Sequence, residues 1–150
     1  LVLSDALKFA SATPFDAILL DAPCSSTGTV RRHPDVPWTK TPEDIRKLAD
    51  LQRRMLDHAA TLLRPGGRIV FANCSLDPAE GEEMIRGFLA ARPEFSIDPL
   101  REGEIAGADA LIDASGALRT TPADMEGERP ELSGCDGFYA VRLLREGQAG

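Results

Sequence analysis

Short apolar runs alternate with longer segments of helical periodicity along most of this chain. Residues 17–20 and 69–72 are apolar and bounded by turn-forming residues, which predicts two short, buried, parallel strands. Between them, apolar residues recur about every 3.6 positions over residues 45–63, with either Leu51 or Gln52 in the stripe, which predicts an amphipathic helix. With a second helix and late strands after it, this order predicts an α/β fold with a doubly wound sheet and an antiparallel edge element.

Capping residues mark where each predicted helix begins and ends. Residues 41–44 place Thr before Pro and two acidic residues, which is typical of a helix start. Residues 64–67 contain Pro and two glycines, which end this helix and turn the chain into the next strand. Asp77 and Glu80 form a capping-box pattern that predicts the start of a second helix, and this helix ends before Pro93.

The remaining segments predict loops and late strands. Residues 22–40 hold three prolines, which predicts a loop without regular helix. Residues 95–98 predict a short strand, and residues 99–134, rich in Gly, Asp and Pro, predict loops with one hairpin at 113–116. Residues 137–144 predict a last strand that closes the sheet.

The first residues predict that the sheet is incomplete at its N-terminal side. Residues 1–3 have the pattern of a strand end that enters a loop at Asp5. Because a globular domain rarely opens on a buried strand, we expect a truncation here. Such a truncation would expose apolar sheet surface, through which we expect the chain to associate with another copy or another protein.

The composition predicts one globular domain in the cytoplasm. The chain has 150 residues, of which 43% are hydrophobic and 27% are charged, enough for one domain with a core. No apolar run approaches the roughly 18 residues of a membrane span, and no leader-like pattern opens the sequence. The three cysteines lack close spacing, so we expect reduced thiols and neither a disulfide framework nor a metal site.

The charge of the chain is unevenly distributed. The net charge of −7 argues against a nucleic-acid partner, because phosphate contacts need Lys and Arg. Residues 28–54, however, hold seven basic and four acidic side chains, which leaves +3 there and −10 for the remainder. This weak basic patch is compatible with a phosphate contact, although a solvated helix face explains most of it.

Two cysteines directly after the two predicted parallel strands carry the candidate chemistry. Cys24 follows the strand at 17–20, and Cys74 follows the strand at 69–72. Reactive groups of open α/β sheets collect at the carboxyl ends of strands, so we expect both thiols to face one crevice. Asp21 stands three residues before Cys24. This constellation suits covalent chemistry on an electrophilic ring and favours an enzyme.

Each of these residues also has a simpler structural interpretation. Cysteine is often a small buried hydrophobe, which is the interpretation that we favour for Cys135. The paired placement of Cys24 and Cys74 argues against it at those positions. His33 lies nine residues after Cys24 and would suit a Cys–His hydrolase, but no oxyanion loop is evident. For Trp38, we favour packing of the loop onto the core over stacking on a base.

Several motifs together resemble the Nol/Nop/Sun family of S-adenosylmethionine-dependent RNA cytosine-5 methyltransferases. They are Asp-Ala-Pro-Cys-Ser-Ser-Thr-Gly at 21–28, Arg-Arg-His-Pro-Asp at 31–35, Leu-Arg-Pro-Gly-Gly at 63–67, Asn-Cys-Ser-Leu at 73–76 and Asp-Gly-Phe-Tyr at 136–139. The first and fourth, each at a strand end, are the most specific. The resemblance covers nearly the whole chain and implies the Rossmann-like sheet of class I methyltransferases.

The resemblance also implies a role for several residues. Cys74 would be the nucleophile, Cys24 would act in product release, and Asp21 would hold the edge of the cytosine. Asp5, beside the adenine ring, together with Asp21 and Pro23, would contact S-adenosylmethionine. A helix N-cap is an equally good interpretation of Asp5.

The resemblance further implies an RNA substrate, with small-subunit ribosomal RNA expected. The predicted RNA contacts are Arg31, Arg32, His33 and Lys40. The chain departs from the family pattern at Asn73, where Thr is frequent. It also lacks the Gly-rich cofactor loop and the acidic ribose ligand of the family's first strands. Residues 1–150 therefore resemble the C-terminal portion of one methyltransferase domain, with most of the cofactor site absent.

Two other functions stay open at this point. A non-catalytic RNA- or protein-binding remnant of the fold would also lack the cofactor loop. A DNA cytosine-5 methyltransferase also uses a Pro-Cys element, but there the Pro-Cys thiol, here Cys24, would itself be the nucleophile.

Overall fold

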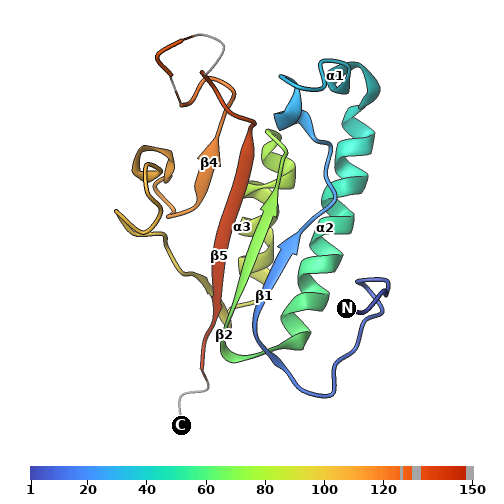
Figure 1. The fold of residues 1–150 in the computed structure, drawn as a ribbon. Coiled ribbons are helices and arrows are strands. Elements are labelled where there is room, and N and C mark those ends of the chain that lie inside the picture. Colours follow the sequence, from blue (N-terminus) through green and yellow to red (C-terminus); the bar gives the residue numbers. More distant parts are fainter. Residues whose placement is uncertain (126, 130–132, 148–150) are drawn as a thin grey trace.

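A five-stranded mixed sheet organises residues 1–125, 127–129 and 133–147, which this computed structural model describes. The strands are β1 (Phe15–Asp21), β2 (Leu63–Asn73), β3 (Phe95–Ile97), β4 (Leu118–Thr120) and β5 (Phe138–Arg145). β1 pairs with β2 in parallel, and β2 pairs with β5 antiparallel (Figure 1). The predicted α/β fold is confirmed. The short strand predicted after Pro93 is present as β3, and the predicted hairpin is present with a bridge between Ile112 and Leu118.

The last strand lies inside the sheet and does not close it, contrary to the prediction, whereas the predicted antiparallel edge element is present as β3 and β4. β5 pairs with β2 along one side and with both β3 and β4 along the other. Tyr139, Val141 and Leu143 alternate along β5 as buried residues. β3, the predicted short strand, and β4, which follows the predicted hairpin turn, supply the hydrogen bonds of its second side. Their pairing with β5 joins segments that are distant in sequence, and no local pattern predicts it.

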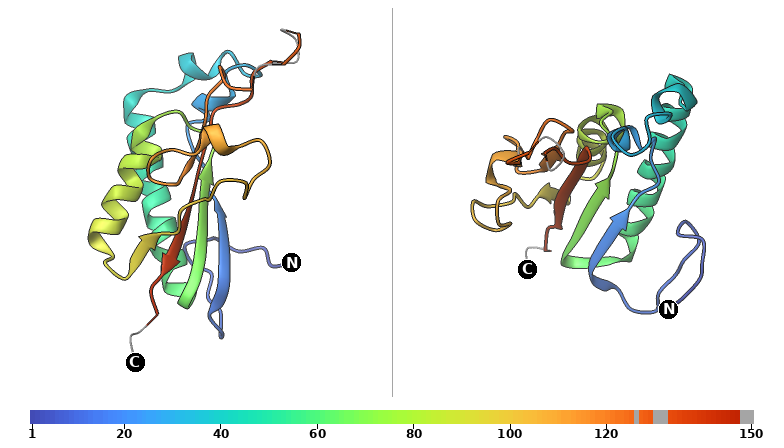
Figure 2. Two further views of the ribbon diagram at one scale, coloured as in Figure 1. Left: turned by 90° about the vertical axis from the view of Figure 1, so that its left-hand side faces the viewer. Right: turned by 45° about the horizontal axis from the view of Figure 1, so that its top comes forward.

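The helices cover one face of the sheet (Figures 1 and 2). They are α1 (Val36–Thr39), α2 (Pro42–Leu62) and α3 (Glu82–Ala91), with 3₁₀ turns at Thr27–Thr29, Pro78–Glu80 and Asp109–Leu111. Apolar residues of α2 and α3, including Leu56 and Phe88, pack against Phe71 and Val141 of the sheet. A doubly wound sheet carries helices on both faces, and the described residues place them on this face alone. Among these residues, no helix is long and apolar enough to cross a membrane.

Two local predictions need correction. The loop at 22–40 contains the single helical turn α1, because Pro37 lies in its first turn, where proline removes no helical hydrogen bond. The strand β2 begins at Leu63 and not at Arg68, but its register against β1 shifts over residues 64–67. Gly66 in this irregularity has a φ of 76°, a conformation that favours glycine.

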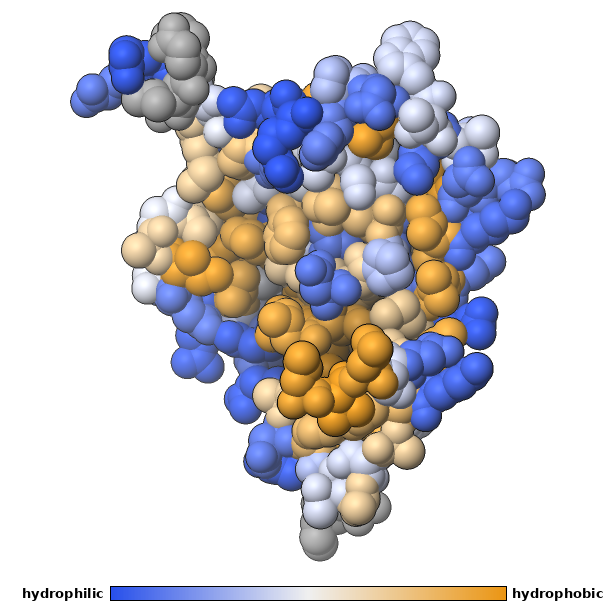
Figure 3. Space-filling view, turned by 45° about the vertical axis from the view of Figure 1, so that its right-hand side comes forward, coloured by the Kyte–Doolittle hydropathy of each residue, from blue (hydrophilic) through white to orange (hydrophobic). Residues whose placement is uncertain are grey.

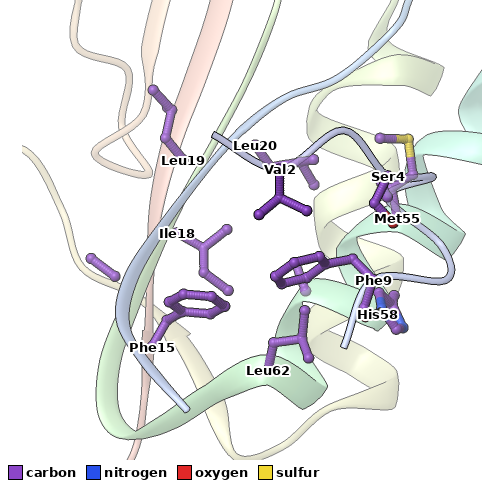
Figure 4. A pocket seen from close by; sticks show the side chains of 13 residues that line it. Val2, Ser4, Phe9, Phe15, Ile18, Leu19, Leu20, Met55, His58 and Leu62 are labelled. Carbon is purple, nitrogen blue, oxygen red and sulfur yellow. Dashed lines mark hydrogen bonds between the residues drawn. The ribbon is translucent and has the colours of Figure 1, made fainter. Parts of the chain in front are cut away.

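The N-terminal segment forms no strand, contrary to the prediction. The Asp5 carboxylate accepts a hydrogen bond from Leu7 N (2.9 Å), which stabilises a turn. The segment then packs against β1 and α2: the rings of Phe9 and Phe15 stack at 6.1 Å, and His58 Nε2 lies 2.8 Å from the Phe9 carbonyl oxygen. Between these elements lies an apolar groove of about 380 Å³ (Figure 4).

This side of the molecule also presents exposed apolar residues. Leu19 of β1 is 72% exposed, and Leu1, Val2 and Leu3 are at least as exposed. Figure 3 shows apolar residues gathered into one patch on the side that carries the N-terminal segment. Association through this surface stays a prediction.

The start of α2 is the clearest confirmed local prediction and yields a test. Thr41 Oγ1 accepts from Asp44 N (3.2 Å), and Asp44 Oδ2 accepts from Thr41 N (3.0 Å), so a complete capping box is present. Thr41→Ala should lower the free energy of unfolding by about 1 kcal/mol, because it removes the acceptor of a helical N–H group. Urea unfolding followed by circular dichroism measures this change. Thr61→Ala in the last turn of the same helix is the control, and an equal loss there would contradict a capping effect.

Candidate active site

The carboxyl ends of β1 and β2 bring the two predicted cysteines into contact. Asp21 lies opposite Ala72 in the register, and Ala22 N donates to the Ala72 carbonyl (3.0 Å), which extends the pairing by one residue. The chain leaves the sheet on both strands directly afterwards. The Sγ atoms of Cys24 and Cys74 are 3.4 Å apart, so the structure places both thiols in one site.

A close backbone approach supports the Cys24 loop. Gly28 N donates to the Cys74 carbonyl (2.9 Å), and Gly137 N donates to the Gly28 carbonyl (2.8 Å). A Cβ atom at Gly28 would lie 2.0 Å from the Gly137 carbonyl oxygen, so no side chain fits there. Ser26 adopts a left-handed conformation with φ of 60°, and its hydroxyl lies 3.6 Å from Cys74 Sγ.

The contact between the sulfurs affects their protonation. Burial, with a smaller contribution from the Cys74 side chain, raises the pKa of the Cys24 thiol to about 11. Cys24 therefore carries its proton at neutral pH. Two thiols in contact do not both ionise readily, because the two negative charges would repel each other in a partly buried site.

A buried polar network beneath the thiols was missed in the sequence. Glu80 was interpreted as part of a capping box, but only Asp77 caps the 3₁₀ turn, by accepting from Ala79 N (2.9 Å). The Glu80 carboxylate is instead fully buried and accepts from Ser25 N (2.9 Å) and from Gln52 Nε2 (2.8 Å). One residue in the sequence did indicate this network: Gln52 is a polar residue at a core position of the apolar stripe of α2.

Asn73, the departure from the family pattern, belongs to the same network. Its Nδ2 group donates to the Glu80 carbonyl (2.7 Å), and its Oδ1 atom accepts from Ser75 N (3.0 Å). Asn73 is fully buried at the end of β2. It therefore fixes the backbone on both sides of Cys74.

The predicted cofactor residues are only partly brought together. Asp21 and Pro23 are exposed at the carboxyl end of β1, next to Cys24. Asp5 lies in the N-terminal turn, where its carboxylate also pairs with Lys8 (3.8 Å). Among the described residues, no hydrogen bond or ion pair links Asp5 to Asp21 or Pro23.

The predicted RNA contacts fall into two groups. Arg31 and Arg32 make contacts within the molecule: Arg31 donates to the Ser133 carbonyl (2.7 Å), and Arg32 pairs with Asp136 and holds the pKa of that carboxyl below its usual range. They join the Cys24 loop to the segment before β5. His33 and Lys40, by contrast, are exposed.

Burial was also predicted for two residues outside these groups, Trp38 and Cys135. Trp38 is 89% exposed on α1, so the prediction that it packs onto the core was wrong. A single helical turn at the end of a loop offers it no apolar surface to cover. Cys135, predicted to be a small buried hydrophobe, is only partly buried, and its thiol lies 3.3 Å from the Thr121 carbonyl oxygen.

The raised pKa of Cys24 predicts its alkylation behaviour. The rate of alkylation by iodoacetamide should keep rising up to about pH 11, whereas an ordinary cysteine levels off above about pH 8.5, because only the thiolate reacts. Peptide mapping by mass spectrometry after short pulses at each pH gives the profile. In Cys74→Ala the profile should shift to lower pH, since the neighbouring thiol no longer opposes ionisation. A profile centred near pH 8.5 in the unmodified protein would contradict this account.

Comparison with known proteins identifies the family. The family model described as 16S rRNA methyltransferase RsmB/F matches residues 2–144. A "Ribosomal RNA small subunit methyltransferase B" from Shewanella oneidensis is 40% identical over 132 residues, which cover 87% of this chain and 27% of that protein. The corresponding protein of Vibrio vulnificus is 52% identical over 83 residues, or 55% of this chain and 20% of that protein. The chain thus spans about a quarter of the length of these relatives.

Solved structures agree with this assignment. NSun6 from Pyrococcus horikoshii, solved with SFG, superposes with a TM-score of 0.73 at 26% identity, over 96% of this chain and 34% of that chain. PH0851 superposes with a TM-score of 0.68 at 35% identity, over 85% of this chain and 26% of that chain. The mixed sheet is therefore the Rossmann-like sheet of methyltransferases, and the resemblance to the Nol/Nop/Sun family is confirmed. With its matching motifs, fold and relatives, this chain belongs to the RsmB/F family of 16S rRNA methyltransferases.

Proposed function

We propose that this chain is the C-terminal portion of an S-adenosylmethionine-dependent methyltransferase domain that methylates carbon 5 of cytosine in small-subunit ribosomal RNA. The observation that carries the proposal is the contact of 3.4 Å between Cys24 Sγ and Cys74 Sγ at the carboxyl ends of two parallel strands. Membership of the RsmB/F family supports the methyltransferase reaction and the RNA substrate.

The reaction needs a nucleophile because carbon 5 of cytosine is too poor in electrons to attack a methyl sulfonium group. The Cys74 thiolate adds to carbon 6, and the carbon–sulfur bond that forms makes carbon 5 an enamine carbon. Carbon 5 then takes the methyl group that S-adenosylmethionine supplies. Asp21, exposed beside the site, interacts with nitrogen 3 and stabilises the charge that moves onto the ring.

Product release needs a base near Cys74. Removal of the proton from carbon 5 restores the ring double bond and expels the Cys74 thiolate. The carbon–sulfur bond that forms in the first step is thereby broken. Once Cys74 is bonded to carbon 6, Cys24 gives its own proton to water, and its thiolate then accepts the carbon 5 proton, directly or through water. Its sulfur is placed for this step by its contact with that of Cys74. The target base must leave its stack to reach the site, and exposed Lys40 and His33 are available to flanking phosphates.

The residues present fit one edge of a cofactor site. Asp21 and Pro23 are exposed at the strand end and would contact S-adenosylmethionine next to the thiols. Asp5, engaged in its turn with Leu7 and Lys8, would have to leave these contacts to reach an adenine ring. The remainder of the cofactor site would come from other parts of a longer protein.

The two cysteines give the sharpest test of this function. The full-length protein should transfer label from S-adenosylmethionine to cytosine carbon 5 of unmodified small-subunit ribosomal RNA. Cys74→Ala should abolish transfer, since no adduct forms, and Cys24→Ala should accumulate a covalent protein–RNA adduct visible on denaturing gels. Cys135→Ala, at the third cysteine, is the matched control and should retain activity without an adduct.

Other outcomes point to the alternative functions. Loss of the adduct in Cys24→Ala, with its retention in Cys74→Ala, would assign the nucleophile to Cys24, as in a DNA cytosine-5 methyltransferase. RNA binding without any binding of S-adenosylmethionine would support a non-catalytic remnant.

A further inference from the structure

Glu80 is a fully buried carboxylate that has no part in the proposed bond-making steps. Its Oε1 atom accepts from Ser25 N (2.9 Å) and from Gln52 Nε2 (2.8 Å). Its Oε2 atom accepts from the hydroxyls of Ser25 and Ser75, the latter at 2.7 Å. A buried carboxylate is costly unless donors surround it, and the four donors here meet that requirement.

The donors come from both cysteine loops. Ser25 directly follows Cys24, and Ser75 directly follows Cys74. The two serine hydroxyls also lie 3.2 Å from each other, so Glu80 and the serines form a closed triangle one residue away from each sulfur. Because Ser25 and Glu80 are 55 positions apart along the chain, this hydrogen bond joins two segments that are distant in sequence.

We propose that Glu80 is a positioning residue that holds the Cys24 and Cys74 loops together and thereby sets the separation of the two sulfurs. The inference rests on the proposed function for the importance of that separation, but the separation itself is measurable without any methyl transfer. A carboxylate suits the position because its two oxygens accept from several donors at once, and so bridge both loops.

The network continues into α2, which gives Glu80 a fixed support. Gln52 Nε2 donates to the Pro23 carbonyl (2.9 Å) as well as to Glu80, and Asn73 Nδ2 donates to the Glu80 carbonyl (2.7 Å). Glu80 is therefore held through its backbone from β2 and through its side chain from α2. A support with two anchors restricts motion of the loops better than either serine alone.

The test measures how readily the two thiols cross-link. Diamide oxidises Cys24 and Cys74 to a disulfide by accepting two electrons and two protons, and the rate depends on how often the sulfurs meet in a suitable geometry. Mass spectrometry of the linked peptides follows this rate in the full-length protein and its variants. The temperature is one at which circular dichroism shows every variant to be folded.

Removing the acceptor should slow cross-linking. We expect the rate in Glu80→Ala to fall on the order of tenfold, because a shift of about 1 Å in reacting groups costs up to a hundredfold in comparable cases. Glu80→Gln should retain most of the rate, since its oxygen still accepts from Ser25 N and its amide donates to the hydroxyls. Ser75→Ala leaves Glu80 in place and removes the Ser75 hydroxyl, which contacts Glu80, Ser25 and Thr27 and accepts from Asp77 N. It should give an intermediate rate, and it tests the proposal if Glu80→Ala does not fold.

The controls separate positioning from stability. Glu83→Ala, exposed on the first turn of α3, should cross-link at the unmodified rate. In methyl transfer at the same temperature, where circular dichroism shows every variant to be folded, Glu80→Ala should lower kcat and leave KM for the RNA unchanged. Glu80→Gln should restore most of kcat, because its side chain still bridges the two loops. Equal cross-linking rates in folded Glu80→Ala and the unmodified protein would overturn the proposal. Slower cross-linking in a protein whose unmodified form transfers no methyl group would support the positioning role and refute the proposed function.

Discussion

The parallel register between β1 and β2 is the constraint on which the candidate site depends. Because Asp21 lies opposite Ala72, both strands leave the sheet at the same level, and the next few residues of each meet above the sheet edge. A slip of one residue would turn every side chain of a strand to the other face and separate the thiols. The register is in turn fixed by apolar side chains such as Ile69 and Phe71, which pack under α2 and α3.

What the sequence predicts well is what local patterns determine. The start of α2 follows from Thr41 and its neighbours, and the strands of the parallel pair follow from short apolar runs between turn residues. The meeting of Cys24 with Cys74 was also predictable, because strand ends in an α/β sheet share an edge. Motif resemblance, and not periodicity, supplied the candidate roles of these residues.

What the sequence predicts poorly depends on contacts between distant segments. Glu80 carries a local capping signature, yet its side chain joins residues 28 and 55 positions away. Arg31 and Arg32 are basic residues beside a reactive cysteine, but their partners lie more than 100 positions along the chain. Such polar side chains bond to segments that come close only in the folded chain, and a window of neighbouring residues does not contain these partners.

The sulfur–sulfur contact has a consequence for how the proposed reaction is ordered. Carbons 5 and 6 of cytosine are bonded neighbours, so a ring face that presents carbon 6 to Cys74 would bring carbon 5 close to Cys24. The raised pKa keeps the proton on Cys24 at neutral pH, which leaves Cys74 as the thiol that is proposed to add to carbon 6. Once Cys74 is bonded to carbon 6, it no longer opposes ionisation of Cys24. A larger fraction of Cys24 is then the thiolate, which is the form that can accept a proton at this stage. In the proposed reaction, a fixed contact between the two loops would thus let Cys74 act first as nucleophile and Cys24 act afterwards as base.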